Sequence, residues 1–133
     1  MSKYTGSLDT NVAMRILLND IPRQHEKSLK LVEDSRKKFL VSDTVIIEIV
    51  YALNSYYGFN REQIADTVTS LAKVPNLVMN HNVILAAIDH FVSHQSLSFE
   101  DCYLAESANK NSAEPLFTFD KKLASQHQSA VLL

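Results

Sequence analysis

The chain has 133 residues, of which 46% are hydrophobic and 21% are charged, and its formal net charge at pH 7 is −2. This length and composition predict a single globular domain over residues 1–133, with one sizeable core. The slightly acidic balance argues against a protein that coats nucleic acid through a basic surface. No stretch approaches the roughly 20 apolar residues of a membrane span, and the N-terminus lacks an apolar signal region. With Cys102 as the single cysteine, these features predict a cytoplasmic protein with no membrane segment.

Short apolar runs alternate with amphipathic segments along the chain. Pro22 is expected to stop the first helix, Gly58 to end the third, and Asn60 to cap the fourth. The expected strands cover residues 4–8, 39–41, 76–79, 115–119 and 130–133. The expected helices cover residues 10–19, 23–37, 44–57, 61–73, 83–95, 98–110 and 121–126.

This alternation predicts an α/β fold with a central, mainly parallel sheet of four or five short strands and helices on both faces. In such folds ligands bind beyond the carboxyl ends of the strands. Asp9 directly follows the first expected strand and Asp120 follows the fourth. Glu48 lies within the helix after the second strand, and Asp101 lies in the first turn of another helix. We therefore expect the four carboxylates to gather at one edge of the sheet.

A structural interpretation exists for each acid taken singly. Asp9 and Asp120 could be helix caps, and Asp101 follows Ser98 as in a capping box. Glu48 is different, because it stands in an aliphatic run where we expect it to be buried. A buried carboxylate is costly unless it is paired or bound to metal. A structural ion pair with Arg15 or a lysine would also account for it.

Carboxylates that converge repel one another unless cations are present. Oxygen ligands with no accompanying histidine or cysteine suit Mg²⁺ or Mn²⁺ better than zinc. Such an ion activates water and neutralises charge on a phosphodiester, which is the chemistry of a metal-dependent nuclease.

Four segments in order resemble the successive motifs of the PIN domain, and most closely those of VapC-type ribonuclease toxins of type II toxin–antitoxin systems. These segments are residues 8–12, 46–50, 98–102 and 117–123. The resemblance implies a three-layer α/β/α sandwich that binds Mg²⁺ or Mn²⁺ and hydrolyses RNA. It also implies a homodimer that is inhibited by a small cognate antitoxin protein.

The resemblance assigns the pocket residue by residue. It implies that Asp9, Glu48, Asp101 and Asp120 form the catalytic, metal-binding set, with Asp9 and Asp101 as the direct ligands. Asn11 and Thr118 match polar positions that shape the pocket.

Other residues give weaker signals. Arg15 and Lys121 could contact a phosphate, although a solvated surface role is favoured for both. His90 and His94 stand four residues apart on one helix face, but no third metal ligand is evident. Cys102 is expected to be a small buried residue rather than a nucleophile. Three tyrosines are expected in the core or at an interface rather than stacking on bases, namely Tyr51, Tyr56 and Tyr57.

Two alternative functions stay open. The first is a catalytically inactive PIN-like binding module in which the acids serve folding. The second is an aspartate-based phosphoryl-transfer or receiver-like domain with Asp9 as the phosphorylated residue. The second is disfavoured because Asn11 stands where a nucleophilic-aspartate phosphatase would carry another aspartate.

Overall fold

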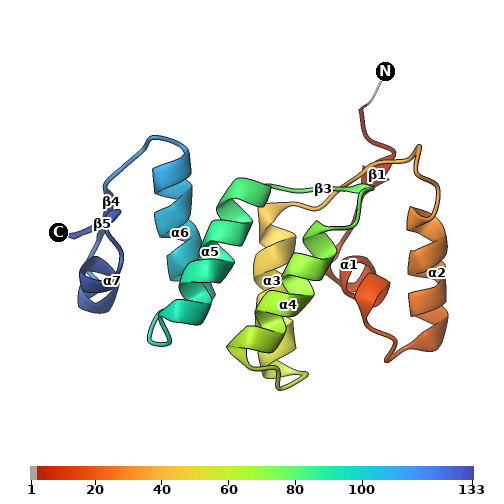
Figure 1. Cartoon of the computed structure of the whole chain (residues 1–133), viewed down its shortest axis with the longest axis horizontal. Helices are drawn as coiled ribbons and strands as arrows, with labels where there is room; N and C mark the ends of the chain where they lie inside the picture. The colour runs from red at the N-terminus through yellow and green to blue at the C-terminus, as the bar shows by residue number, and fades with distance from the viewer. Residues whose placement is uncertain (1–2) are drawn as a thin grey trace. The chain divides into compact units, whose positions relative to one another are not determined.

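The computed structural model describes residues 3–133, and Figure 1 labels the elements of the chain. The chain divides into two compact units, the first ending at Asn80 and the second covering His81–Leu133. Within the described residues, no helix has both the length and the apolar character needed to cross a membrane.

The described part of the first unit combines three short strands with four helices. Its strands are β1 (Gly6–Ser7), β2 (Phe39–Leu40) and β3 (Leu77–Val78). Its helices are α1 (Thr10–Leu17), α2 (Pro22–Val32), α3 (Asp43–Ser55) and α4 (Arg61–Ala72).

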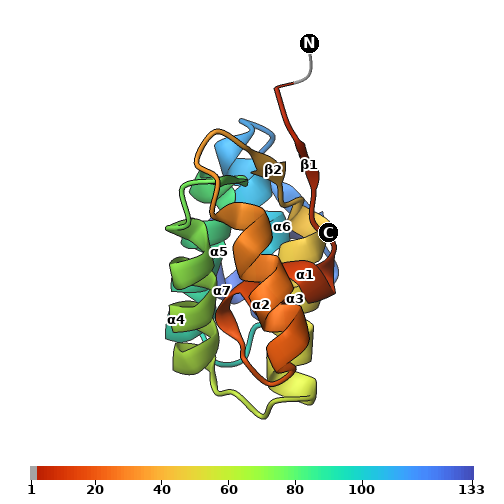
Figure 2. The same cartoon turned by 90° about the vertical axis from the view of Figure 1, so that its right-hand side faces the viewer.

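The three strands of the first unit form one parallel sheet in the order β1-β2-β3. Gly6 pairs with Phe39, and Phe39 pairs in turn with Leu77. Figure 2 shows β1 and β2 side by side, with α1 leading away from the end of β1. Because the strands are parallel, their carboxyl ends share one edge, and α1 and α3 begin within three residues of that edge.

The core of the first unit lies where α1 packs against α2, α3 and α4. Apolar side chains at helical spacing on α3 and α4 are withdrawn from water there, which supplies the main stabilising free energy. The fully buried members include Ala13, Ile46, Leu53 and Val68.

The second unit contains three helices and a two-stranded sheet. The elements are α5 (His81–Ser93), α6 (Phe99–Lys110), β4 (Leu116–Thr118), α7 (Lys121–Gln126) and β5 (Ala130–Leu132). The strands β4 and β5 pair in parallel, with Leu116 opposite Ala130. Helix α5 packs along α6, and α7 contacts both strands. Ile84, Ala87 and Ala105 are fully buried.

The predicted α/β class and parallel strand pairing are confirmed. All five expected strands form, but hydrogen bonding divides them into a sheet of three and a sheet of two. The role assigned to Pro22 is wrong: α1 ends at Leu17, and Pro22 begins α2 instead. Proline is tolerated there because the first helical amide has no partner within the helix. Helix α2 stops at Val32, before a turn in which Asp34 accepts from the amide and side chain of Arg36.

The side chain of Leu53 gives a direct test of the core. Leu53→Ala is expected to lower the free energy of unfolding by about 2–5 kcal/mol, because it leaves a cavity in a packed interior. Leu29 is 43% exposed on α2, and Leu29→Ala is the matched control with a change within about 0.5 kcal/mol. Urea denaturation of both variants measures the difference, and equal midpoints would contradict this description of the core.

Candidate functional site

Asp9 occupies the junction between β1 and α1. Its Oδ1 accepts a hydrogen bond of 2.9 Å from the Val12 amide, so the carboxylate caps the helix. The side chain is exposed, and its second oxygen has no hydrogen-bond partner among the described residues. Asp9 therefore caps α1 with one oxygen and presents the other to solvent.

Glu48 contacts the start of α1. The hydroxyl of Thr10, the residue after Asp9, donates a 2.5 Å hydrogen bond to Glu48 Oε2. This contact joins the start of α1 to the second turn of α3 across 38 residues of sequence. The first unit thus places two of the four predicted acids at the same edge of its sheet.

The expectation that Glu48 is buried is wrong, because its side chain is exposed. Its neighbours one turn before and one turn after on α3, Thr44 and Tyr51, are exposed as well. The buried stripe of the helix runs instead through Ile46, Ile49 and Leu53. Glu48 therefore lies on the solvent side of the helix and needs no buried partner.

A cavity of about 270 Å³ adjoins Asp9. It lies within the first unit, between α1 and α2, and is lined by Asp9, Asn11, Val12, Arg15, Gln24, Lys27 and Ser28. It contains the predicted polar residue Asn11 and two cationic side chains beside one carboxylate. An acid and two cations at one cavity can accommodate a metal ion and a phosphate together.

Arg15 departs from its predicted solvated role, because only 7% of the residue is exposed. Its Nε lies 3.4 Å from Asp20 Oδ1, yet neither Nε nor Nη1 has a hydrogen-bond partner of proper geometry within the described residues. Tyr57 donates a hydrogen bond to Asp20. That bond, and more weakly the charge of Arg15, lower the pKa of Asp20 and keep it ionised. Arg15 therefore lines the cavity, and two of its guanidinium nitrogens are buried without a hydrogen-bond partner among the described residues.

The other two predicted acids lie in the second unit. The amide of Asp101 donates to Ser98 Oγ at 3.2 Å, which places Asp101 in the first turn of α6. Asp120 caps α7, because its Oδ1 accepts from the amides of Lys122 and Leu123 at 2.9 and 3.3 Å. Thr118 Oγ1 accepts a 3.0 Å hydrogen bond from the amide of Asp120 and so steadies its backbone.

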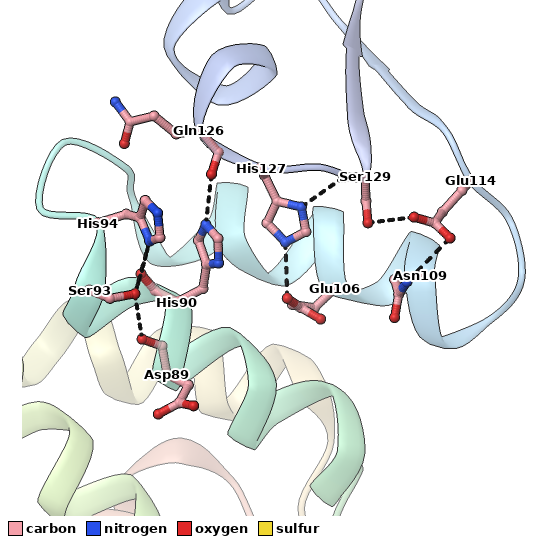
Figure 3. A network of polar contacts seen from close by, with 10 residues as sticks. All are labelled: Asp89, His90, Ser93, His94, Glu106, Asn109, Glu114, Gln126, His127 and Ser129. Carbon is pink, nitrogen blue, oxygen red and sulfur yellow. Dashed lines mark hydrogen bonds and ion pairs between the residues drawn. The ribbon is translucent and has the colours of Figure 1, made fainter.

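A cluster that the sequence analysis missed lies in the second unit (Figure 3). Possible ligand atoms of His90, Glu106 and His127 all lie within 4.8 Å of one another. His94, which shares a helix face with His90, stacks on the ring of His90 with centroids 3.8 Å apart. Burial, aided by the charges of His127 and His94, lowers the pKa of His90 and favours its neutral form. The helical spacing of the two histidines was the only signal in the sequence, because Glu106 and His127 come from other elements.

Cys102 and two of the tyrosines differ in exposure. Cys102 is fully buried in α6, as expected of a packing residue. Tyr51 and Tyr56 are 60% and 79% exposed, so neither lies in the core, and their expected place at an interface stays a prediction. Their rings contact each other edge to face, with centroids 6.3 Å apart.

A comparison with models of protein families matches the PIN domain over residues 7–127. The chain belongs to the PIN domain family. The PIN domain is a nuclease-type fold, and its members are generally hydrolases that typically use a divalent metal. A search of curated proteins finds no match to this chain.

The cap formed by Asp9 can be tested by two substitutions. Asparagine caps a helix about as well as aspartate, whereas alanine loses about 0.5–2 kcal/mol of stability. We expect Asp9→Asn to unfold near the wild-type temperature and Asp9→Ala to unfold at a lower one. Thermal unfolding followed by circular dichroism measures both melting temperatures. Equal melting temperatures for the two variants would contradict a stabilising cap at Asp9.

Proposed function

We propose that this PIN-domain protein is an endoribonuclease that depends on Mg²⁺ or Mn²⁺ and acts as the toxin of a toxin–antitoxin pair. The observation that carries the proposal is the hydrogen bond from Thr10, the residue after Asp9, to Glu48 at the sheet edge of a PIN domain. Asp101 and Asp120 are further proposed catalytic residues, on the basis of the family motifs in which they stand. RNA is the proposed substrate, and a cognate antitoxin and a second copy of the chain are the proposed partners in the cytoplasm.

The residues of the first unit fit a hard divalent cation. Asp9 and Glu48 each have one carboxylate oxygen outside any hydrogen bond to the described residues. Both side chains are exposed, so neither oxygen has to be uncovered before it can act as a ligand. Oxygen ligands of this kind suit Mg²⁺ and Mn²⁺. When bound, such an ion lowers the pKa of an attacking water and neutralises charge on the phosphodiester.

The chain's own side chains have separate roles around this centre. Thr10 donates to Glu48 and thereby holds that carboxylate against the start of α1. Lys27 and Arg15 line the cavity beside Asp9 and supply positive charge for a phosphate of the bound RNA. Asn11 offers an amide in the lining of the same cavity. No histidine among the described residues is assigned the role of general base, so the metal ion would supply the activated water.

Cleavage of RNA tests the metal mechanism. We expect purified protein to cleave RNA with Mg²⁺ or Mn²⁺ and to stop in excess chelator. Asp9→Asn, which keeps the helix cap, is expected to lower the rate by about 10²-fold or more, since electrostatic contacts to a reacting centre have effects of that size. Asp66→Asn is the matched control, because Asp66 is exposed on α4. Undiminished cleavage in chelator, or a wild-type rate in Asp9→Asn, would refute the proposal.

Lys27 gives a second test, through binding rather than cleavage. Lys27→Gln is expected to weaken binding of a non-cleavable single-stranded RNA uniformly across sequences. It should also reduce the slope of log affinity against log salt by about 0.7, the value for one phosphate contact on a single strand. Lys30 is exposed on the same helix and is absent from the cavity lining, so Lys30→Gln should leave the slope unchanged. Equal slopes in both variants would contradict a contact between Lys27 and an RNA phosphate.

The toxin role has its own test in cells. Brief induction of the wild-type chain should arrest growth and produce defined RNA cleavage sites, whereas Asp9→Asn should produce neither. Co-expression of the protein encoded by a short adjacent gene should relieve the arrest if that protein is the antitoxin. Growth without arrest, together with cleavage of RNA in vitro, would leave the nuclease proposal standing and refute the toxin role.

A further inference from the structure

Three titratable side chains converge in the second unit without a part in the proposed nuclease chemistry. His90 comes from α5, Glu106 from α6, and His127 directly follows α7. Their possible ligand atoms all lie within 4.8 Å of one another, and Figure 3 shows the side chains converging. Among the residues that the structure describes, these three form the one group of at least three histidine, cysteine or acidic side chains whose ligand atoms come this close together.

His127 is held on both sides of its ring. Only 4% of the residue is exposed. The Ser129 amide donates to Nδ1 at 3.0 Å, and Nε2 lies 2.9 Å from Glu106 Oε1. Because Nδ1 accepts a hydrogen bond, the neutral ring carries its proton on Nε2 and donates it to Glu106. A proton therefore occupies the position between the two side chains.

His90 is held in the way that is usual for a metal-binding histidine. Its Nε2 donates to the backbone carbonyl of Gln126 at 3.1 Å, which leaves a lone pair on Nδ1. No described residue forms a hydrogen bond with Nδ1. Metal-binding histidines almost always donate their second ring nitrogen to a carbonyl or carboxylate, because that bond fixes the tautomer and the orientation. Stacking on His94 restrains the ring further.

The cluster opens onto a cavity of about 330 Å³ within the second unit. His90, Glu106 and His127 line it together with polar side chains that include Asp89, Ser93 and Asn109. A cavity of this size has room for several water molecules beside the three side chains. Water or a small anion there would complete the coordination shell of an ion.

We propose that His90, Glu106 and His127 bind a divalent transition metal of the Zn²⁺ class. Two imidazoles and one carboxylate suit zinc and its neighbours, whereas Mg²⁺ prefers oxygen ligands alone. Three protein ligands with an open position are typical of zinc sites that retain an exchangeable ligand. The ion joins α5, α6 and the segment after α7, so it stabilises the second unit as a whole.

Metal binding has a specific consequence at Ser129. The ion takes the place of the proton on His127 Nε2, and the neutral ring then carries its proton on Nδ1. That proton faces the Ser129 amide, which is also a donor, so their hydrogen bond is lost. Ser129 directly precedes β5, and its carbonyl accepts from the Leu116 amide of β4 at 2.7 Å. Zinc binding therefore changes the environment of the connection into β5.

The test uses untagged, full-length protein stripped of metal with chelator and then freed of the chelator. Calorimetric titration with Zn²⁺ is expected to show one ion per chain, and thermal unfolding to shift upward by several degrees. Glu106→Gln keeps the acceptor for His127 and loses the carboxylate ligand, and His90→Gln removes one imidazole. Each should weaken zinc binding by at least about 100-fold, beyond the 10–100-fold effect of losing a mere supporting group.

The controls distinguish this site from the nuclease centre and from stacking alone. His94→Gln removes the stacked ring and should retain zinc binding. Asp9→Asn should also retain it, so a failure of the nuclease proposal leaves this one unaffected. In nuclear magnetic resonance spectra the amide signal of Ser129 should move with Zn²⁺ and stay unmoved with Mg²⁺.

Two results would overturn the proposal. One is the absence of zinc binding by the wild-type chain, and the other is unchanged affinity in both Glu106→Gln and His90→Gln. A Ser129 amide signal that does not respond to bound zinc would remove His127 from the ligand set and so refute the three-ligand site.

Discussion

The hydrogen bond from the Val12 amide to Asp9 Oδ1 determines where β1 passes into α1. With only two residues in β1, the strand contributes few hydrogen bonds, and the helix cap defines the edge of the sheet. The same device recurs where Asp120 caps α7. In both cases one carboxylate oxygen accepts from the backbone and the other has no hydrogen bond to the described residues. Capping and metal binding are therefore compatible roles for one side chain.

The distribution of charge in the first unit is the reverse of the sequence-based expectation. Glu48 is exposed, whereas Arg15 is buried. An exposed carboxylate retains its hydration, so Glu48 gains from the Thr10 hydrogen bond without the cost of burial. A buried guanidinium loses hydration, and its ion pair with Asp20 restores only part of it.

Side-chain hydrogen bonds support the second unit, whose sheet has only two strands. Ser129 Oγ donates to Glu114 at 2.6 Å, and Asn109 donates to the other oxygen of Glu114 at 3.2 Å. These two bonds lower the pKa of Glu114 and keep it ionised. With the contact between His127 and Glu106, they link α6 to the segment around β5, as Figure 3 shows. Such a network is stabilising only when each member has its partner. A ligand that binds at the histidine cluster would therefore change the stability of the network.

The sequence by itself determined the order and the type of the elements and placed nearly all their bounds within two residues, because these follow from hydrophobic periodicity and from caps such as Asn60 and Ser98. It also determined the PIN family, through four motifs in order. Only the tertiary structure decided that Glu48 is exposed, that Arg15 is buried, and that His90 meets Glu106 and His127. Burial depends on which helix face the neighbouring elements cover, and the bond between Glu106 and His127 joins residues 21 positions apart. Patterns within one element predict neither the buried face of a helix nor a bond between distant residues, because both arise from the packing of one element against another.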